Sequence, residues 1–135
     1  MALSTAEAVG TAVLEGWKLN FRGSRTGSYL TIEPCKKGRV PVAVWSVSKE
    51  DEKALDRYEG YPTFYYKREG IMLDVLSPDG KIQRLKTFVY IMREDAPEGV
   101  PTFLYMDTCM EGYSDFGFNN DYLWKAYSHV SRKLA

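Results

Sequence analysis

The sequence of 135 residues has only one histidine and two cysteines, too few to build a typical metal centre. Neither Cys35 nor Cys109 belongs to a CxxC motif, so we expect both thiols to be reduced and packed. His129 falls in a terminal helical segment with no cysteine or carboxylate at ligand spacing. We therefore expect His129 to be a surface or packing residue, and we expect no metal site.

An excess of charge of one sign is also lacking, because Lys plus Arg and Asp plus Glu number 18 each. Without a net basic field, the chain has little to attract a nucleic acid or an anionic membrane. No apolar run approaches the roughly 18 residues of a membrane span. The N-terminal MALSTAEAVG also lacks the basic-then-apolar order of a secretory signal. We expect a cytoplasmic protein that binds neither nucleic acid nor membrane.

Aromatic residues are abundant, at 14% of the chain with ten tyrosines. Tyrosine combines a large apolar area with a hydroxyl group, so this content suggests a core or cleft lined with rings. A chain of this length can build one core but is short for two. We expect a single domain over residues 1–135.

Alternating apolar residues predict strands over residues 10–21, 29–34 and 40–47. Residues 22–28 have the composition of a turn, and the strand that follows them is expected to end at Pro34. In residues 40–47 both faces are apolar. We therefore expect that strand to be covered on two sides.

A β-hairpin is predicted over residues 64–76 and 82–92, because the Pro, Asp and Gly of residues 77–81 fit the turn between them. Residues 93–101 are expected to form a loop. Together with the helices described next, these strands predict one α+β unit.

Three helices are predicted. The first starts with Ser48 as cap and Asp51 at the third helical position, and it ends near Glu59, because Gly60 suits a left-handed closing residue and Pro62 blocks continuation. The second covers residues 102–116, and the last is capped by Asn119 or Asn120. The apolar residues at helical spacing are Phe103, Met106, Met110 and Tyr113 in the second helix, and Leu123, Ala126, Tyr127 and Val130 in the last.

Glu59 is the residue most suited to chemistry. Leu55 lies four residues earlier and faces the core, so Glu59 emerges at the edge of the buried face. The negative end of the helix dipole and partial burial among neighbouring rings both favour proton uptake by its carboxyl. A glutamate with raised proton affinity suits general acid–base catalysis. The neighbours expected to bury it are Tyr58, Tyr61 and Pro62.

The residues alone leave a second explanation open. An ion pair with Arg57 or Arg68 is the commoner arrangement for a glutamate in this position. Asp56, three residues before Glu59, could act as a second carboxylate, but we expect it to be solvated on the helix flank.

The order of these features resembles the gamma-glutamylcyclotransferase superfamily, which includes the gamma-glutamylamine cyclotransferases. The resemblance extends over about residues 9–122, and the segment LDRYEGYP (55–62) is its most specific part. The other matching residues are VGTA (9–12) with Trp17 and Phe21, GSYLTIEP (27–34), Tyr65, and Pro101-Thr102 with Tyr105 and Gly112.

The resemblance implies a small α+β fold with a mixed, mostly antiparallel, β-barrel-like sheet, flanking helices and a cavity at one end. Members cyclise a gamma-glutamyl group: its own α-amine attacks the γ-carbonyl, which releases an amine or amino acid and leaves 5-oxoproline. The resemblance makes Glu59 the proton shuttle and gives Tyr105 and Tyr65 to the walls of the substrate site. It implies no metal and no organic cofactor.

The sequence departs from the family in one respect. Members begin with a strand ending in Tyr-Gly-Ser-Asn, whose turn presents backbone N–H groups to the substrate, and this motif is absent here. Three explanations compete: a start codon placed too far downstream, a truncated gene, or a loop replaced by another group in an oligomer. We therefore expect a domain truncated at its N-terminus that forms a homodimer or larger assembly.

Two functions stay open at this stage. The first is an enzyme that cyclises a gamma-glutamyl amine or dipeptide to 5-oxoproline. The second is a catalytically impaired small-molecule-binding module of the same fold.

Overall fold

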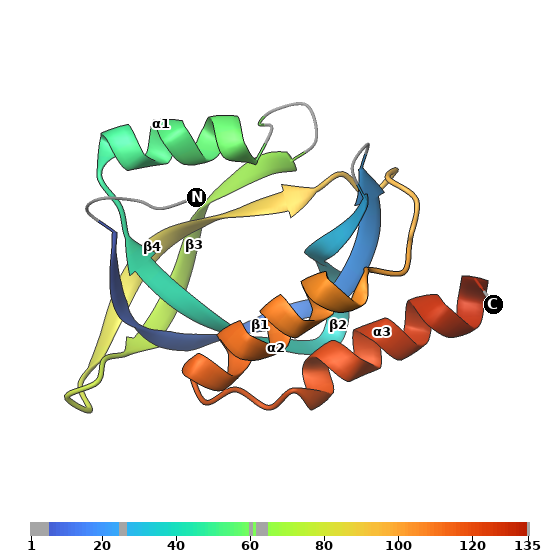
Figure 1. The fold of residues 1–135 in the computed structure, drawn as a ribbon. Coiled ribbons are helices and arrows are strands. Elements are labelled where there is room, and N and C mark those ends of the chain that lie inside the picture. The colour runs from blue at the N-terminus through green and yellow to red at the C-terminus, as the bar shows by residue number, and fades with distance from the viewer. Residues whose placement is uncertain (1–5, 25–26, 60, 62–64, 135) are drawn as a thin grey trace. The chain divides into compact units, whose positions relative to one another are not determined.

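The structure is a computed structural model that describes residues 6–24, 27–59, 61 and 65–134. The described residues form four strands and three helices (Figure 1). The strands form one sheet in the order β2-β1-β3-β4, in which β1 and β3 run antiparallel with Thr11 opposite Leu76. The expected α+β class is confirmed. The elements are β1 (Glu7–Ser24), β2 (Gly27–Ser46), α1 (Lys49–Tyr58), β3 (Tyr65–Leu76), β4 (Ile82–Met92), α2 (Phe103–Asp115) and α3 (Asp121–Leu134).

The chain divides into two compact units. The first unit comprises Met1–Leu14 and Pro41–Ile91, and the second comprises Glu15–Val40 and Met92–Ala135. The chain passes from one unit to the other at three points, which lie within β1, within β2 and at the end of β4. On β1 the boundary lies beside Gly16, whose φ of +85° is in the left-handed region that glycine adopts readily.

β2 continues through Pro34 without interruption, so the strand end expected at Pro34 is wrong. β2 lies at one edge of the sheet order, and a proline is tolerated on an edge strand where its missing N–H would face outward. The turn expected over residues 22–28 is also shorter than predicted, because β1 extends to Ser24 and β2 begins at Gly27.

In the first unit, α1 begins as its sequence predicts. The Ser48 hydroxyl accepts a hydrogen bond from the Asp51 N–H at 3.0 Å, which satisfies one of the free donors at the helix start. At the other end, the Tyr61 N–H donates to the Asp56 carbonyl at 2.9 Å, the bond that closes a Schellman turn. Gly60 and Pro62, the predicted stop signals, lie outside the described residues.

The β3–β4 hairpin of the first unit confirms the prediction, with the Ser77 N–H donating to the Lys81 carbonyl at 2.9 Å across the turn. At the end of β2, however, Trp45 is 51% exposed, so the expectation that this strand is covered on both faces is wrong there. Trp45 is the residue before the last one of β2. The core residues of this unit are Ala12, Leu14, Leu73, Val75 and Ile91.

In the second unit, α2 and α3 share a core with β1 (Figure 1). The predicted apolar face of α3 is confirmed, and the Asn119 side chain caps this helix by accepting from the Asp121 N–H at 2.9 Å. Phe103 is 77% exposed, so its predicted place on the apolar face of α2 is wrong. It is the first residue of α2, before the turns that pack. The core contains Phe21, Met106, Leu123, Ala126 and Val130, with Met110, Tyr113 and Tyr127 against it.

No helix in the described part of the chain is long and apolar enough to cross a membrane.

Candidate functional site

Glu59 lies at the C-cap of α1, with φ −78° and ψ −6°, and its backbone N–H donates to the Leu55 carbonyl at 2.8 Å. Its side chain is half-buried, and this burial raises the pKa of the carboxyl above its ordinary value, the direction that the sequence predicts. Within the described part of the chain, no ion pair joins this carboxyl to Arg57 or Arg68. The rings expected to bury it, Tyr58 and Tyr61, are themselves 64% and 43% exposed.

Lys67 on β3 is the centre of a polar cluster next to Glu59. Its ammonium lies 2.6 Å from a Glu52 carboxylate oxygen and 2.9 Å from an Asp56 oxygen, and its side chain is only 9% exposed. It also lies over three aromatic rings, with 5.2 to 5.6 Å between Nζ and each ring centroid. These rings belong to Tyr61, Phe88 and Tyr90. We call this set of residues the Lys67 cluster.

Asp56 is a member of this cluster, so the expectation that it is solvated on the helix flank is wrong. Its carboxylate accepts hydrogen bonds from Lys67 and, at 2.5 Å, from the Tyr90 hydroxyl. These bonds hold the pKa of Asp56 below its ordinary value. Asp56 therefore remains ionised beside a glutamate that burial favours in its neutral form, a separation of roles typical of acid–base sites.

Lys67 and Tyr90 each keep one protonation state near neutral pH. Burial alone would lower the pKa of Lys67, but hydrogen bonds to Asp56 and Glu52 and their charges raise it to about 12. Burial raises the pKa of Tyr90 above its ordinary value, and its hydrogen bond to Asp56 adds to this effect. The negative charge of Glu59 also raises the pKa of Tyr90, so the two side chains are within electrostatic reach.

Tyr65, a predicted substrate contact, is the first residue of β3 and is half-buried. Residues two apart on a strand point to the same face, so Tyr65 shares its face with Lys67, which contacts α1. Glu59 and Tyr65 thus both belong to the first unit, on the side where β3 meets α1.

Tyr105, the other predicted substrate contact, belongs to the second unit, in the first turn of α2. Its hydroxyl accepts a hydrogen bond from the Leu30 N–H at 3.0 Å, and its ring packs edge-on against Tyr29 with centroids 5.2 Å apart. Burial raises the pKa of the nearby Cys109 thiol, and a hydrogen bond with Tyr105 opposes this shift. Both Cys35 and Cys109 are free cysteines.

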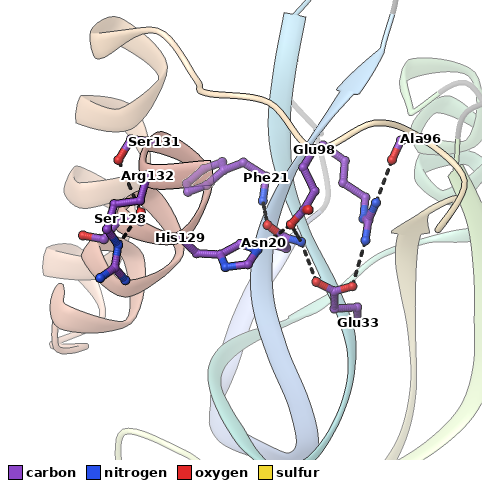
Figure 2. A network of polar contacts seen from close by, with 10 residues as sticks. Asn20, Phe21, Glu33, Ala96, Glu98, Ser128, His129, Ser131 and Arg132 are labelled. Carbon is purple, nitrogen blue, oxygen red and sulfur yellow. Dashed lines mark hydrogen bonds and ion pairs between the residues drawn. The ribbon is translucent and has the colours of Figure 1, made fainter. Parts of the chain in front are cut away.

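The second unit also contains a network around Asn20, which is 1% exposed (Figure 2). Its amide nitrogen donates to Glu33 at 2.5 Å and to Glu98 at 2.8 Å, while its oxygen accepts from the Phe21 N–H at 2.8 Å. Arg22 pairs with Glu33 at 2.9 Å. We call these residues the Asn20 network.

His129 extends the Asn20 network by a contact of 2.6 Å between its Nε2 and Glu98 (Figure 2). It is thus both exposed and paired, a combination that the sequence did not reveal because Glu98 lies 31 residues away. The described residues contain no group of three or more His, Cys, Asp or Glu side chains that could hold a metal ion.

Sequence reasoning missed Lys67 as a site residue, although a signal for it exists. Glu52, Asp56 and Glu59 follow one another at intervals of four and three, so they share one face of α1. A row of carboxylates on a partly buried helix face needs a cation from another element, because buried charges are paired. Lys67, two residues after Tyr65, is in the right place to supply it.

Comparison with known families agrees with this fold. Residues 1–107 match the sequence profile of the family gamma-glutamyl cyclotransferase, AIG2-like. The chain therefore belongs to this family.

Two solved structures share the fold. A gamma-glutamyl cyclotransferase superposes with a TM-score of 0.73 at 23% identity, covering 92% of this chain and 75% of that chain. An uncharacterized protein from Homo sapiens superposes with a TM-score of 0.71 at 25% identity, covering 90% of this chain and 73% of the human one. The comparison with curated proteins finds no significant match.

Proposed function

We propose that this chain is a cyclotransferase that converts a gamma-glutamyl amine or dipeptide to 5-oxoproline, with Glu59 as the proton shuttle. The supporting observation is the Glu59 carboxyl itself: half-buried at a helix end, without an ion pair among the described residues, and raised in pKa by burial. Glu59 also matches the glutamate of the LDxxEG segment that marks the family. Membership of the family supports the reaction class, and the state of the Glu59 carboxyl supports its role as proton shuttle.

The proposed reaction needs proton transfer but no external reactant. A C–N bond forms between the substrate's α-nitrogen and its γ-carbonyl carbon, while the C–N bond to the leaving amine breaks. The Glu59 carboxylate takes one proton from the attacking nitrogen and returns it to the leaving nitrogen. A pKa raised toward neutrality helps both transfers, because the same group must accept and then donate.

Ring closure within one molecule already supplies the proximity of the reacting atoms. The protein is then left with three tasks: folding the substrate into the reactive shape, stabilising the developing oxyanion and moving the proton. We assign Tyr65 and Tyr105 to contacts with the substrate. Changing either to phenylalanine is expected to raise KM more than it lowers kcat.

The proposal is tested with a panel of gamma-glutamyl amines and gamma-glutamyl dipeptides, with 5-oxoproline measured by mass spectrometry. We expect turnover by the wild-type chain and a loss of about 10²- to 10⁴-fold in Glu59→Gln, the usual contribution of a general acid–base group. Glu50→Gln is the matched control, because Glu50 is an exposed glutamate in the first turn of the same helix. Equal turnover in Glu59→Gln and the control would remove Glu59 from the mechanism.

The alternative, a binding module of the same fold, predicts a different result in the same assay. A non-cyclisable gamma-glutamyl analogue would bind in calorimetry, while no member of the panel would be turned over. The oligomeric state stays a separate prediction. Light scattering at micromolar concentration that shows only monomer would contradict the expected homodimer or larger assembly.

A further inference from the structure

We propose that Lys67 is a positioning residue for Glu59: it fixes the turn that carries this carboxyl and so sets how the carboxyl meets a substrate. The inference deepens the proposed function and rests on the role of Glu59 as proton shuttle. It is carried by the contacts of the Lys67 ammonium with chain segments on both sides of Glu59.

The first of these contacts precedes Glu59. The Lys67 ammonium binds Asp56 at 2.9 Å, three residues before Glu59, and Glu52 at 2.6 Å, one turn earlier on the same helix face. The Tyr90 hydroxyl on β4 binds the same Asp56 carboxylate at 2.5 Å. The last two turns of α1 are therefore tied to β3 and β4 by charge-assisted hydrogen bonds, which are stronger and more directional than neutral ones.

The second contact follows Glu59. The same ammonium lies over the Tyr61 ring, 5.3 Å from its centroid, two residues after Glu59. The Tyr61 N–H in turn donates to the Asp56 carbonyl at 2.9 Å. Asp56, Tyr61 and the ammonium thus form a closed loop of contacts, and this loop holds the backbone on both sides of Glu59.

A purely structural role explains this arrangement poorly. A buried cation loses its hydration, and replacing a buried ion pair by well-packed apolar residues is often neutral or even stabilising. An apolar residue at position 67 could fill the space among Tyr61, Phe88 and Tyr90, but it could not hold the Asp56 carboxylate. The ammonium contacts both the Asp56 carboxylate before Glu59 and the Tyr61 ring after it. Accurate placement of a catalytic group can change the reaction rate by large factors.

The activity test compares Lys67→Met, Lys67→Arg and Lys86→Met. Lys86 is an exposed lysine on β4 and serves as the matched control. We expect kcat to fall roughly 10- to 100-fold in Lys67→Met with little change in KM, the size of effect that a misplaced catalytic group produces. Lys67→Arg should recover part of kcat, because its guanidinium keeps the charge and can stack on the rings. Wild-type kcat in Lys67→Met at a temperature where the variant is folded would overturn the inference.

The second test does not depend on activity. Amide hydrogen exchange is measured at Tyr61 and Glu59, whose N–H groups donate to Asp56 and Leu55. We expect faster exchange of these two amides in Lys67→Met, while the amides of the buried α3 residues exchange as in the wild type. Unchanged protection of Tyr61 and Glu59 would overturn the inference even if no substrate were turned over.

The two tests separate this inference from the function on which it rests. If Lys67→Met loses amide protection but the wild-type chain has no cyclotransferase activity, the proposed function is refuted and, with it, the catalytic role of the anchoring. Turnover that depends on Glu59 but not on Lys67 would refute the positioning role alone. If Lys67→Met does not fold, Tyr90→Phe replaces it, because it removes only the hydroxyl that binds Asp56. The same loss of kcat and of Tyr61 protection, smaller in size, is then expected.

Discussion

The two compact units each bury a polar cluster, but the clusters have different centres. In the first unit the centre is a cation, Lys67, which lies between carboxylates of one helix and three rings. In the second unit the centre is a neutral amide, Asn20, which joins Glu33 to Glu98. The Asn20 amide uses both of its donors and accepts one bond, so little of its capacity for hydrogen bonding is left.

The difference between the two clusters lies in how their carboxylates are paired, and it indicates which carboxyl suits proton transfer. Both carboxylates of the Asn20 network have partners: Glu33 pairs with Arg22, and Glu98 pairs with His129. In the first unit, Asp56 forms an ion pair with the Lys67 ammonium, while Glu59 is half-buried without an ion pair among the described residues. A carboxyl excluded from the pairing of its neighbours keeps a raised pKa, which is what proton transfer requires.

The largest expected difference between the two units is tested by neutralising one carboxylate in each unit. Glu59→Gln is expected to lower turnover by about 10²- to 10⁴-fold and to leave the free energy of unfolding almost unchanged. Glu33→Gln is expected to do the reverse, with near-normal kcat and a loss of about 1–2 kcal/mol in stability, because its charge-assisted bonds to Arg22 and Asn20 are weakened. Both variants are measured by steady-state kinetics and urea unfolding. Similar profiles for the two variants would contradict the assignment of chemistry to the first unit.

Removing the centre of the Asn20 network should produce the largest loss of stability. In Asn20→Leu the carboxylates of Glu33 and Glu98 lose a buried donor, and the expected cost is about 3 kcal/mol in urea unfolding. Gln83→Leu, an exposed polar residue on β4, is the control and should change stability by less than about 0.5 kcal/mol. An Asn20→Leu variant as stable as wild type would show that the network does not hold its unit together.

Alkaline pH should weaken the Lys67 cluster specifically. The folded pKa of Lys67, about 12, exceeds the unfolded value of about 10.4, so its contribution is complete below the unfolded value and is lost as pH rises through the folded one. The raised pKa of Tyr90 acts in the same direction. Because the paired carboxylates are partly exposed, we expect a loss of about 1–2 kcal/mol. Urea unfolding between about pH 9 and pH 11.5 measures it, and an equally steep decline in Lys67→Met would contradict the assignment.

The smallest effect is expected at the rim of the Asn20 network. His129 is 47% exposed at its contact with Glu98, so the pair is screened by water and salt. His129→Ala should cost about 0.5 kcal/mol, and less at high salt. A loss greater than about 2 kcal/mol in thermal or urea unfolding would mean that His129 belongs to the buried part of the network.

Local signals in the sequence predicted the elements that local bonds define. Ser48 caps α1, the turn after Leu76 makes the hairpin, and Leu123, Ala126 and Val130 form the buried face of α3. Each of these features depends on residues within one or two helical turns or one hairpin. The strand end predicted at Pro34 failed because its outcome depends on the position of β2 in the sheet, which neighbouring residues do not encode.

For the candidate site, the sequence identified the unusual carboxyl but not its setting. The position of Glu59 at a helix end and the direction of its pKa shift followed from helix geometry and the expectation of burial. The role of Asp56 was missed because Lys67 and Tyr90 come from two strands, 11 and 34 residues away. Pairing of this kind depends on tertiary contacts, and a single sequence does not specify which cation meets which carboxylate.

The passage of β2 through Pro34 also bears on how the chain behaves at high concentration. The exposed Lys36 and Lys37 follow this proline on a strand at the edge of the sheet order. A missing backbone donor next to two positive charges makes this stretch a poor template for a strand of another molecule. The folded protein is therefore expected to resist fibril-like growth along this edge.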